Sequence, residues 1–152
     1  MILRFSKKAL FAIEAVLDIA YYSAGEPVQS GDITRRQGIP RRYLEQALQQ
    51  LVRQGLLVGV RGPNGGYRLA RERRRISVGE IVRVVRKIET NDKEADDMGG
   101  SELGQQVVWP LWHELQDEAM VRLDATTIDD LCTRANECGI NSERRLNLDF
   151  AI

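Results

Sequence analysis

The sequence predicts a mostly α-helical chain with one small β-hairpin, and three observations support this class. Apolar residues repeat at helical spacing along most of the 152 residues. Residues 56–70 instead show two short strand-like runs around a glycine-rich turn. A helix rich in arginine and glutamine lies directly before this hairpin, and a long apolar helix follows later. This order is the winged helix-turn-helix pattern with a long dimerisation helix added.

The first helix is expected to begin after Ser6, a candidate N-cap, and to end at Gly25. Lys7 and Lys8 lie in its first turn, where the helix dipole disfavours positive charge. A bound phosphate would offset this cost, although two solvated lysines tolerated at a small cost explain the sequence equally well. The spacing predicts a buried stripe of Leu10, Ile13, Leu17, Ala20 and Ala24.

A short second helix is expected over residues 30–37, closed by Gly38, and Pro40 suits the first position of a third helix. The third helix should end at Gly55. Its predicted buried stripe is Leu44, Leu48 and Leu51, and its opposite face carries Arg42, Glu45, Gln46, Gln49 and Arg53. Arginine and glutamine can make bidentate contacts with guanine and adenine edges. Many surface helices carry these residues without touching DNA, so the hairpin that follows decides the interpretation.

The hairpin places Arg61 at its tip, beside the turn over residues 62–66, and returns through residues 67–70. A basic run over residues 71–75 follows it. Such a run is usually a solvated connection, but beside a wing we favour contact with DNA phosphates.

A fourth helix is expected over residues 78–88, with Ser77 and Glu80 at capping-box spacing. Residues 89–106 are acidic and contain glycines, which predicts a flexible loop. A last helix is expected over residues 128–137, with Gly139 at its end. The polar tail at residues 139–152 is expected to be poorly ordered.

The long helix between them is expected over residues 108–123, and Pro110 predicts a start near Trp109 or a kink. A helix this apolar beyond a small DNA-binding unit favours packing on a second copy of the chain. Packing against the first helix of the same chain is the alternative, and the two can hold together. The predicted dimer interface is Leu111, Trp112, Leu115, Ala119 and Leu123.

Charge is divided between the two halves, although the formal net charge is zero. Residues 1–88 hold 17 Lys and Arg against 7 Asp and Glu, whereas residues 89–152 hold 5 against 15. A basic front half favours a polyanionic partner. Glu14 and Asp18 interrupt the apolar stretch that would form a secretory signal, and no stretch approaches the roughly 20 apolar residues of a membrane span. We therefore expect a cytoplasmic protein without a membrane partner.

The sequence contains few of the patterns that are typical of catalytic or metal-binding sites, so we expect no enzyme and no metal site. The chain has one histidine, His113, and no phosphate-cradling loop before a helix. Its two cysteines, Cys132 and Cys138, are too few for a disulfide framework. With His113 they make three zinc ligands at most, where four are usual. Packed cysteines are the favoured interpretation, and a thiol or metal sensor is the alternative.

Several segments together resemble the Rrf2 family of bacterial regulators. The matching segments are residues 6–8 (SKK), 39–46 (IPRRYLEQ), 51–57 (LVRQGLL), 60–70 (VRGPNGGYRLA), 76–81 (ISVGEI), 111–112 (LW) and 127–131 (TIDDL). The resemblance covers roughly residues 2–137. It implies a homodimeric winged-helix transcriptional regulator, usually a repressor, that binds double-stranded DNA. It also implies that Tyr43, Glu45 and Gln46 lie at the major groove and that Arg61 enters the minor groove.

Pattern and resemblance together give a set of candidate sites and a division of the chain. The candidate DNA-binding residues are Lys7, Lys8, Arg41, Arg42, Tyr43, Glu45, Gln46, Gln49, Arg61, Gly62, Asn64, Gly65, Gly66 and Tyr67. The expected units are a DNA-binding domain at 1–88, the loop at 89–106, the dimerisation and closing helices at 107–138, and the tail at 139–152.

Many family members hold an iron–sulfur cluster through three cysteines before the dimer helix, but residues 89–106 of this chain contain neither Cys nor His. Thiolates are the normal ligands of such clusters, so we expect no cofactor. The sequence thus resembles the cluster-free, CymR-like branch, which by analogy suggests a metabolic-enzyme partner. A winged-helix module that binds such a protein rather than DNA is the alternative function.

Overall fold

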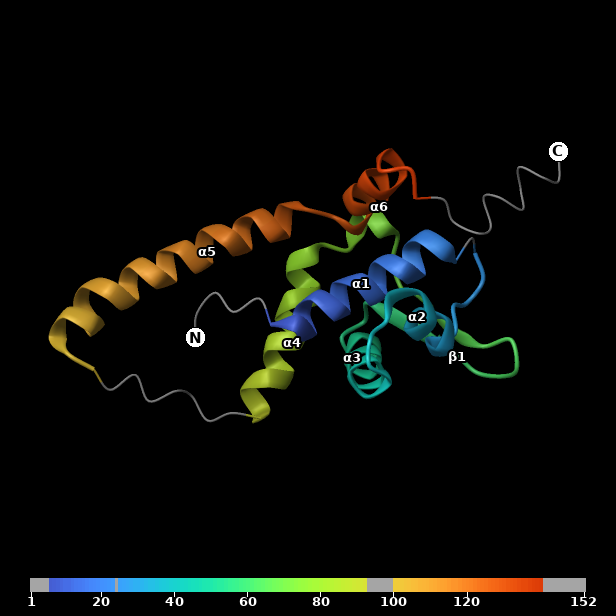
Figure 1. Cartoon of the computed structure of the whole chain (residues 1–152), viewed down its shortest axis with the longest axis horizontal. Coiled ribbons are helices and arrows are strands. Elements are labelled where there is room, and N and C mark those ends of the chain that lie inside the picture. Colours follow the sequence, from blue (N-terminus) through green and yellow to red (C-terminus); the bar gives the residue numbers. More distant parts are fainter. Residues whose placement is uncertain (1–5, 24, 93–99, 141–152) are drawn as a thin grey trace.

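The structure is a computed structural model that describes residues 6–23, 25–92 and 100–140. A compact body is built around α1, and α5 extends away from it (Figure 1). The elements in order are α1 (Lys7–Tyr22), α2 (Ser30–Gln37), α3 (Arg41–Arg53), β1 (Leu57–Val60), β2 (Gly66–Leu69), the 3₁₀ turn η1 (Arg73–Arg75), α4 (Val78–Asp92), the π-helical turn η2 (Gly104–Val108), α5 (Trp109–Ala125) and α6 (Ile128–Glu137). The mostly helical class with one antiparallel hairpin is confirmed.

Helix α1 forms the centre of the core, but the expected stripe lies only at its margin: Ile13, Leu17 and Ala20 are partly buried against it, and Ala24 lies outside the described residues. Leu10 is 49% exposed, whereas Ala12, Ala15, Val16 and Ile19 are fully buried. Apolar side chains lie on more than one face of this helix, so periodicity alone did not select the face. The alanines on the buried face let the neighbouring helices approach α1 closely.

The turn between α2 and α3 follows the predicted chemistry. Gly38 ends α2 in the left-handed conformation, with φ of 65°, which glycine adopts without steric cost. Pro40 is the N-cap of α3 rather than its first residue. Leu44, Leu48 and Leu51 are buried against the body as predicted.

The segment between α4 and α5 is helical over more residues than the sequence suggested. Ser77 and Glu80 form the predicted capping box, and α4 continues to Asp92. Helical structure resumes at Glu102, so the expected loop at 89–106 was too long at both ends. Pro110 lacks the N–H that a regular helix needs, and α5 accordingly begins at Trp109 after a π-helical turn.

Helix α6 folds back onto the body. Thr127 is its N-cap and forms a capping box with Asp130 at its start. Ile128 and Cys132 belong to the same core as α1. Beyond α6, the hydroxyl of Tyr21 donates a hydrogen bond to the carbonyl of Ile140, and the expected tail lies outside the described residues from 141 onward. No helix of the described ranges is long and apolar enough to cross a membrane.

Candidate nucleic-acid interface

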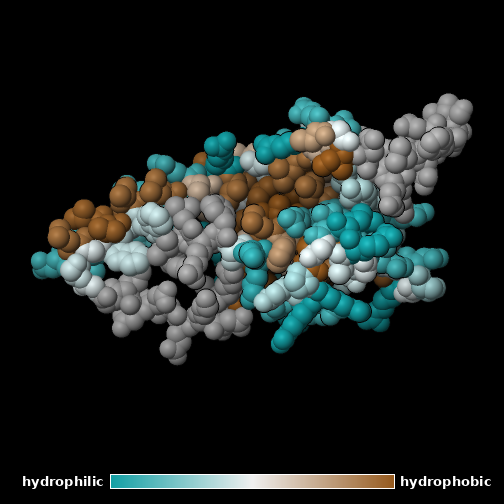
Figure 2. All heavy atoms as spheres, viewed as in Figure 1, coloured by the Kyte–Doolittle hydropathy of each residue, from teal (hydrophilic) through white to brown (hydrophobic). Residues whose placement is uncertain are grey.

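The exposed face of α3 carries the polar residues that the sequence selected. Arg41, Arg42, Tyr43, Glu45, Gln46 and Gln49 are all exposed. Their position follows from the leucines on the other side of the helix, which are buried against the body. Hydrophilic side chains dominate the surface over α2 and α3 (Figure 2). The helix therefore presents a row of hydrogen-bonding groups that a DNA groove could accept.

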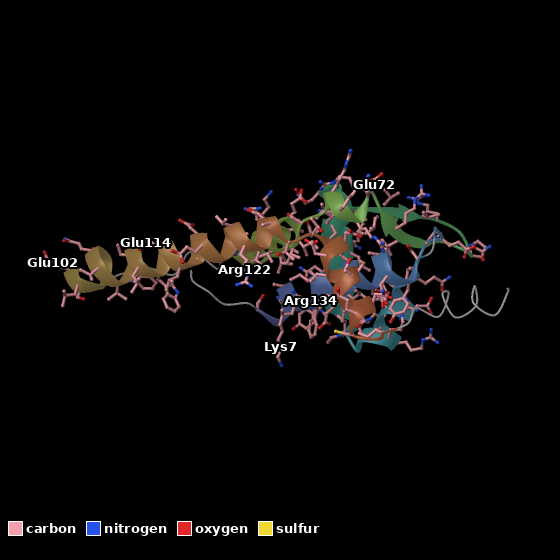
Figure 3. The ribbon with its side chains drawn as sticks, turned by 90° about the horizontal axis from the view of Figure 1, so that it is seen from above. Lys7, Glu72, Glu102, Glu114, Arg122 and Arg134 are labelled. Carbon is pink, nitrogen blue, oxygen red and sulfur yellow. The ribbon has the colours of Figure 1, made fainter. Side chains whose placement is uncertain are left out.

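Two contacts join side chains of this face to their neighbours. The Nε of Arg41 donates a hydrogen bond to Glu45 Oε1 at 3.0 Å, one turn further along α3. Lys8 Nζ lies 5.2 Å from the ring centroid of Tyr43, a cation–π distance. The first turn of α1 is thereby brought against the start of α3. Lys7, beside it, is exposed (Figure 3).

The hairpin is attached to the helix-turn-helix unit through the residues that precede α2. Strands β1 and β2 pair antiparallel, with Val60 opposite Gly66. On its other side β2 pairs with Val28, because the backbone N–H and carbonyl of Tyr67 both bond to Val28 at 2.8 Å. Gln29 Nε2 also donates to the carbonyl of Pro63 at 3.3 Å. These bonds fix the direction in which the wing leaves the body.

The glycines of the turn have different roles. A Cβ on Gly65 would overlap the carbonyl oxygen of Val60, and one on Gly66 would overlap the carbonyl oxygen of Val28. Gly65 is buried, so we assign it a structural role in the turn instead of a contact with DNA. Arg61, Gly62 and Asn64 are exposed at the tip. Tyr67 is half-buried, with its backbone used in the sheet.

The basic run after the hairpin is largely paired within the chain. Arg71 contacts Glu80 at 3.1 Å, Arg73 contacts Asp129 at 2.8 Å, and Arg74 contacts Glu72 at 2.7 Å. The hydrogen bond from Arg74 lowers the pKa of Glu72. These three arginines thus have carboxylate partners within the chain, and contact of the run with DNA phosphates stays a prediction.

A buried ion pair beneath the helix-turn-helix was not anticipated. Asp18 of α1 is only 1% exposed and is bonded by Arg36 and Gln37 of α2. The sequence held one indication of it, a single aspartate within the otherwise apolar run at residues 15–20.

The expected dimer residues lie on a helix that the described chain leaves uncovered. Leu111 is 54% exposed and Leu115 39% exposed, and α5 has no fully buried residue. Trp112, Ala119 and Leu123 are half-buried. The indole N–H of Trp112 is shielded from solvent and has no hydrogen-bond partner within the described ranges. Apolar side chains cover the far end of α5 in Figure 2, and Figure 3 shows Glu102 and Glu114 along the part that projects from the body.

The other end of α5 is joined closely to α4. The guanidinium of Arg83 makes two hydrogen bonds of 2.6 Å to the carboxylate of Asp124, which lowers the pKa of Asp124 and raises that of Arg83. A Cβ on Gly79 would overlap this carboxylate, so glycine permits the close approach. The orientation of α5 is therefore tied to the body that carries α3 and the hairpin.

Comparison with known proteins identifies the family. The model of the Rrf2 family, described as an iron-dependent transcriptional regulator, matches residues 5–134. The chain belongs to the Rrf2 family. Its curated relatives include the HTH-type transcriptional regulators IscR of Cronobacter sakazakii and of Vibrio atlanticus. The first is 35% identical over 85% of this chain and 80% of the relative, and the second is 35% identical over 99% and 86%.

Solved structures of Rrf2 regulators share the fold. T. potens IscR has a TM-score of 0.72 at 31% identity, covering 95% of this chain and 96% of that one. CymR of B. subtilis, titled the global cysteine regulator, has a TM-score of 0.68 at 26% identity, covering 87% and 98%. The winged-helix class and the expected role in DNA-binding transcription regulation are therefore confirmed.

The residues of this Rrf2 chain do not fit an iron–sulfur cluster held by thiolates. Cys132, a residue of α6, is buried in the core, and Cys138 is exposed at the end of that helix. The sequence between α4 and α5 contains no cysteine. Within the part of the chain that the structure describes, no group of three or more His, Cys, Asp or Glu could hold a metal ion.

Proposed function

We propose that this Rrf2 regulator is a cytoplasmic homodimer that binds a specific DNA operator and represses transcription. In this proposal α3 lies in the major groove, where Arg42, Tyr43, Glu45, Gln46 and Gln49 meet base edges and nearby phosphates. Arg61 and Asn64 at the wing tip reach the adjacent minor groove. Lys7 and Lys8 contact phosphates, which offsets the cost of placing them at the start of α1.

The observation that carries the proposal is the joint placement of α3 and the wing. The polar face of α3 is exposed while its leucines are buried, and the hairpin is attached directly ahead of α2 by the bonds between Val28 and Tyr67. Two DNA-reading elements are thus held by one rigid unit. Nothing in the described surface favours a partner enzyme, and that partner stays a prediction.

The uncovered face of α5 supports the homodimer. Leu111 and Leu115 lie exposed on a helix that projects from the body. Two such helices packed along a two-fold axis would bury these side chains and place two α3 helices for a symmetric operator. Repression rests on the family resemblance. We further propose that the protein does not sense its signal through an iron–sulfur cluster held by thiolates, because the sequence between α4 and α5 contains no cysteine.

The decisive experiment measures DNA affinity after removal of the wing arginine. Operator sequences are first selected with the wild-type dimer from random duplexes, and the upstream region of the gene is tested beside them. Arg61→Ala should weaken operator binding by about 1–3 kcal/mol and relax specificity at the positions beside the wing. Arg134→Ala is the matched control, since Arg134 is exposed on α6, away from the hairpin (Figure 3). Equal affinity of the Arg61 variant and wild type would contradict the minor-groove role.

Lysines at the phosphates should behave differently from residues at the bases. Lys7→Ala should weaken binding to all sequences alike and reduce the slope of log affinity against log salt by about one. A loss confined to one operator sequence would instead assign Lys7 to base recognition. Adding the wild-type dimer to a transcription reaction on the selected operator should lower the yield of transcript if the protein represses.

A further inference from the structure

Asp18 is the one charged side chain that is buried within the described residues, with 1% of its surface exposed. Its carboxylate accepts hydrogen bonds from Arg36 Nε at 2.9 Å, from Arg36 Nη2 at 2.8 Å and from Gln37 Nε2 at 2.8 Å. The guanidinium of Arg36 also lies 4.5 Å from the ring centroid of Tyr22. These contacts thus fix the orientation of each side chain in the cluster.

The cluster lies at the point where α2 turns into α3. Arg36 and Gln37 are the last two residues of α2, Gly38 follows in the left-handed conformation, and α3 begins at Arg41. Ile39, in the connection, is 1% exposed and leaves the turn little freedom. Because the connection is short and packed, a rotation of the end of α2 about α1 would move the start of α3 with it.

Stability alone is a weak explanation for this arrangement. Taking two charges out of water costs several kcal/mol, and buried ion pairs replaced by apolar residues of similar volume often leave a protein equally or more stable. An apolar contact between α1 and α2 would, however, permit several arrangements of nearly equal energy. Three directional hydrogen bonds to one carboxylate permit far fewer.

We propose that Asp18, Arg36 and Gln37 form a positioning cluster that sets the orientation of α3 and so determines operator specificity without contacting DNA. The inference rests on the proposed DNA-binding function. Loss of the cluster leaves the charged surface in place, so the attraction to DNA of any sequence remains. Only the alignment of Tyr43, Gln46 and their neighbours with the bases is lost.

The test compares operator affinity with affinity for a scrambled duplex of equal length, using the full-length protein. Asp18→Leu combined with Arg36→Met removes one negative and one positive charge, so the net charge and the nonspecific attraction stay the same. Specific DNA-binding proteins prefer their sites by ~10³-fold or more, and this preference should fall by about tenfold or more in the double variant. Thermal melting and light scattering check that it remains folded and keeps the oligomeric state of the wild type.

The control is the exposed pair on the same helix, Asp32 and Arg35, which are 3.4 Å apart and about half exposed. Asp32→Leu with Arg35→Met changes the same charges and should leave the preference within about twofold, because exposed pairs contribute little. Arg36→Lys is a second variant that keeps the charge and the packing but loses the two-pronged bond, and its preference should also fall.

A preference unchanged in folded Asp18→Leu/Arg36→Met, or in Arg36→Lys if the double variant does not fold, would overturn the positioning role. Wild-type protein that shows no preference for any selected operator would instead refute the proposed function itself.

Discussion

The body and α5 both carry apolar residues at helical spacing, yet only the body buries these residues within one chain. Leu44, Leu48 and Leu51 of α3 are at most 1% exposed, whereas the 17 residues of α5 include none that is buried. Helical periodicity of apolar residues occurs in both, although it is much stronger along α3 than along α5. It shows that a helix must cover one face, but it does not show whether the cover comes from its own chain.

The difference also separates two kinds of stability. The packing of the body is complete in the described chain, so its free energy of unfolding should not depend on protein concentration. In the proposed homodimer a second copy of the chain covers the exposed face of α5, so the contribution of this face to stability should grow with protein concentration. Substitutions in the two regions can therefore be told apart by varying the concentration alone.

The largest effect is expected from Leu48→Ala, which empties part of the core between α3 and the body. Leu48 is fully buried, and such truncations lower the free energy of unfolding by about 2–5 kcal/mol. Urea denaturation followed by circular dichroism measures this loss, which should be equal at low and high protein concentration. The matched control is Leu103→Ala, because Leu103 is 72% exposed and should cost less than about 0.5 kcal/mol in dilute protein. A similar loss for both variants in dilute protein would remove the distinction between the regions.

A second substitution should break association while leaving the body folded. Leu111→Glu places a charge on the uncovered face of α5, and burying it against a second copy would cost several kcal/mol. The variant should elute and scatter light as the 17.2 kDa monomer, with an unchanged helical spectrum. His113→Glu adds the same charge at an exposed position two residues away, and its oligomeric state should match the wild type. A wild-type protein that is monomeric at all concentrations would refute the dimer, and another partner would then cover α5.

Much of the fold could be predicted because local rules decided it. Local sequence patterns predicted three features that the structure confirms. These are the buried leucines of α3, the helix end at Gly38 and the turn at residues 62–66. The buried face of α1 could not be predicted from periodicity, because its neighbours pack on several sides of it. The acidic composition of residues 89–106 favoured a loop, yet helical contacts extend α4 and begin the helix before Trp109.

The candidate site shows the same limit. The exposure of the polar residues on α3 and at the wing tip could be predicted, because it depends on patterns that span only a few residues of the sequence. The pairing of Arg71, Arg73 and Arg74 with carboxylates could not, since two of the partners lie more than eight residues away in the chain. The bonds from Arg36 and Gln37 to Asp18 likewise join residues 18 and 19 positions apart. Contacts of this kind depend on tertiary packing, which a single sequence does not display.

The smallest effect is expected at the joint between the two regions, where Arg83 meets Asp124. Both side chains are roughly half exposed, so solvent screens the pair and its coupling should not exceed about 1 kcal/mol. A double-mutant cycle of Arg83→Met and Asp124→Asn, followed by urea denaturation, isolates that coupling. Because Arg83 lowers the pKa of Asp124 below its ordinary 3.8, the stabilisation is complete above that pH and is lost as the pH falls through the lowered pKa. The coupling should therefore be present at pH 7, shrink below about pH 3.8 and weaken in high salt. A coupling that persists after the carboxylate is protonated would mean that packing at Gly79, and not charge, joins α5 to the body.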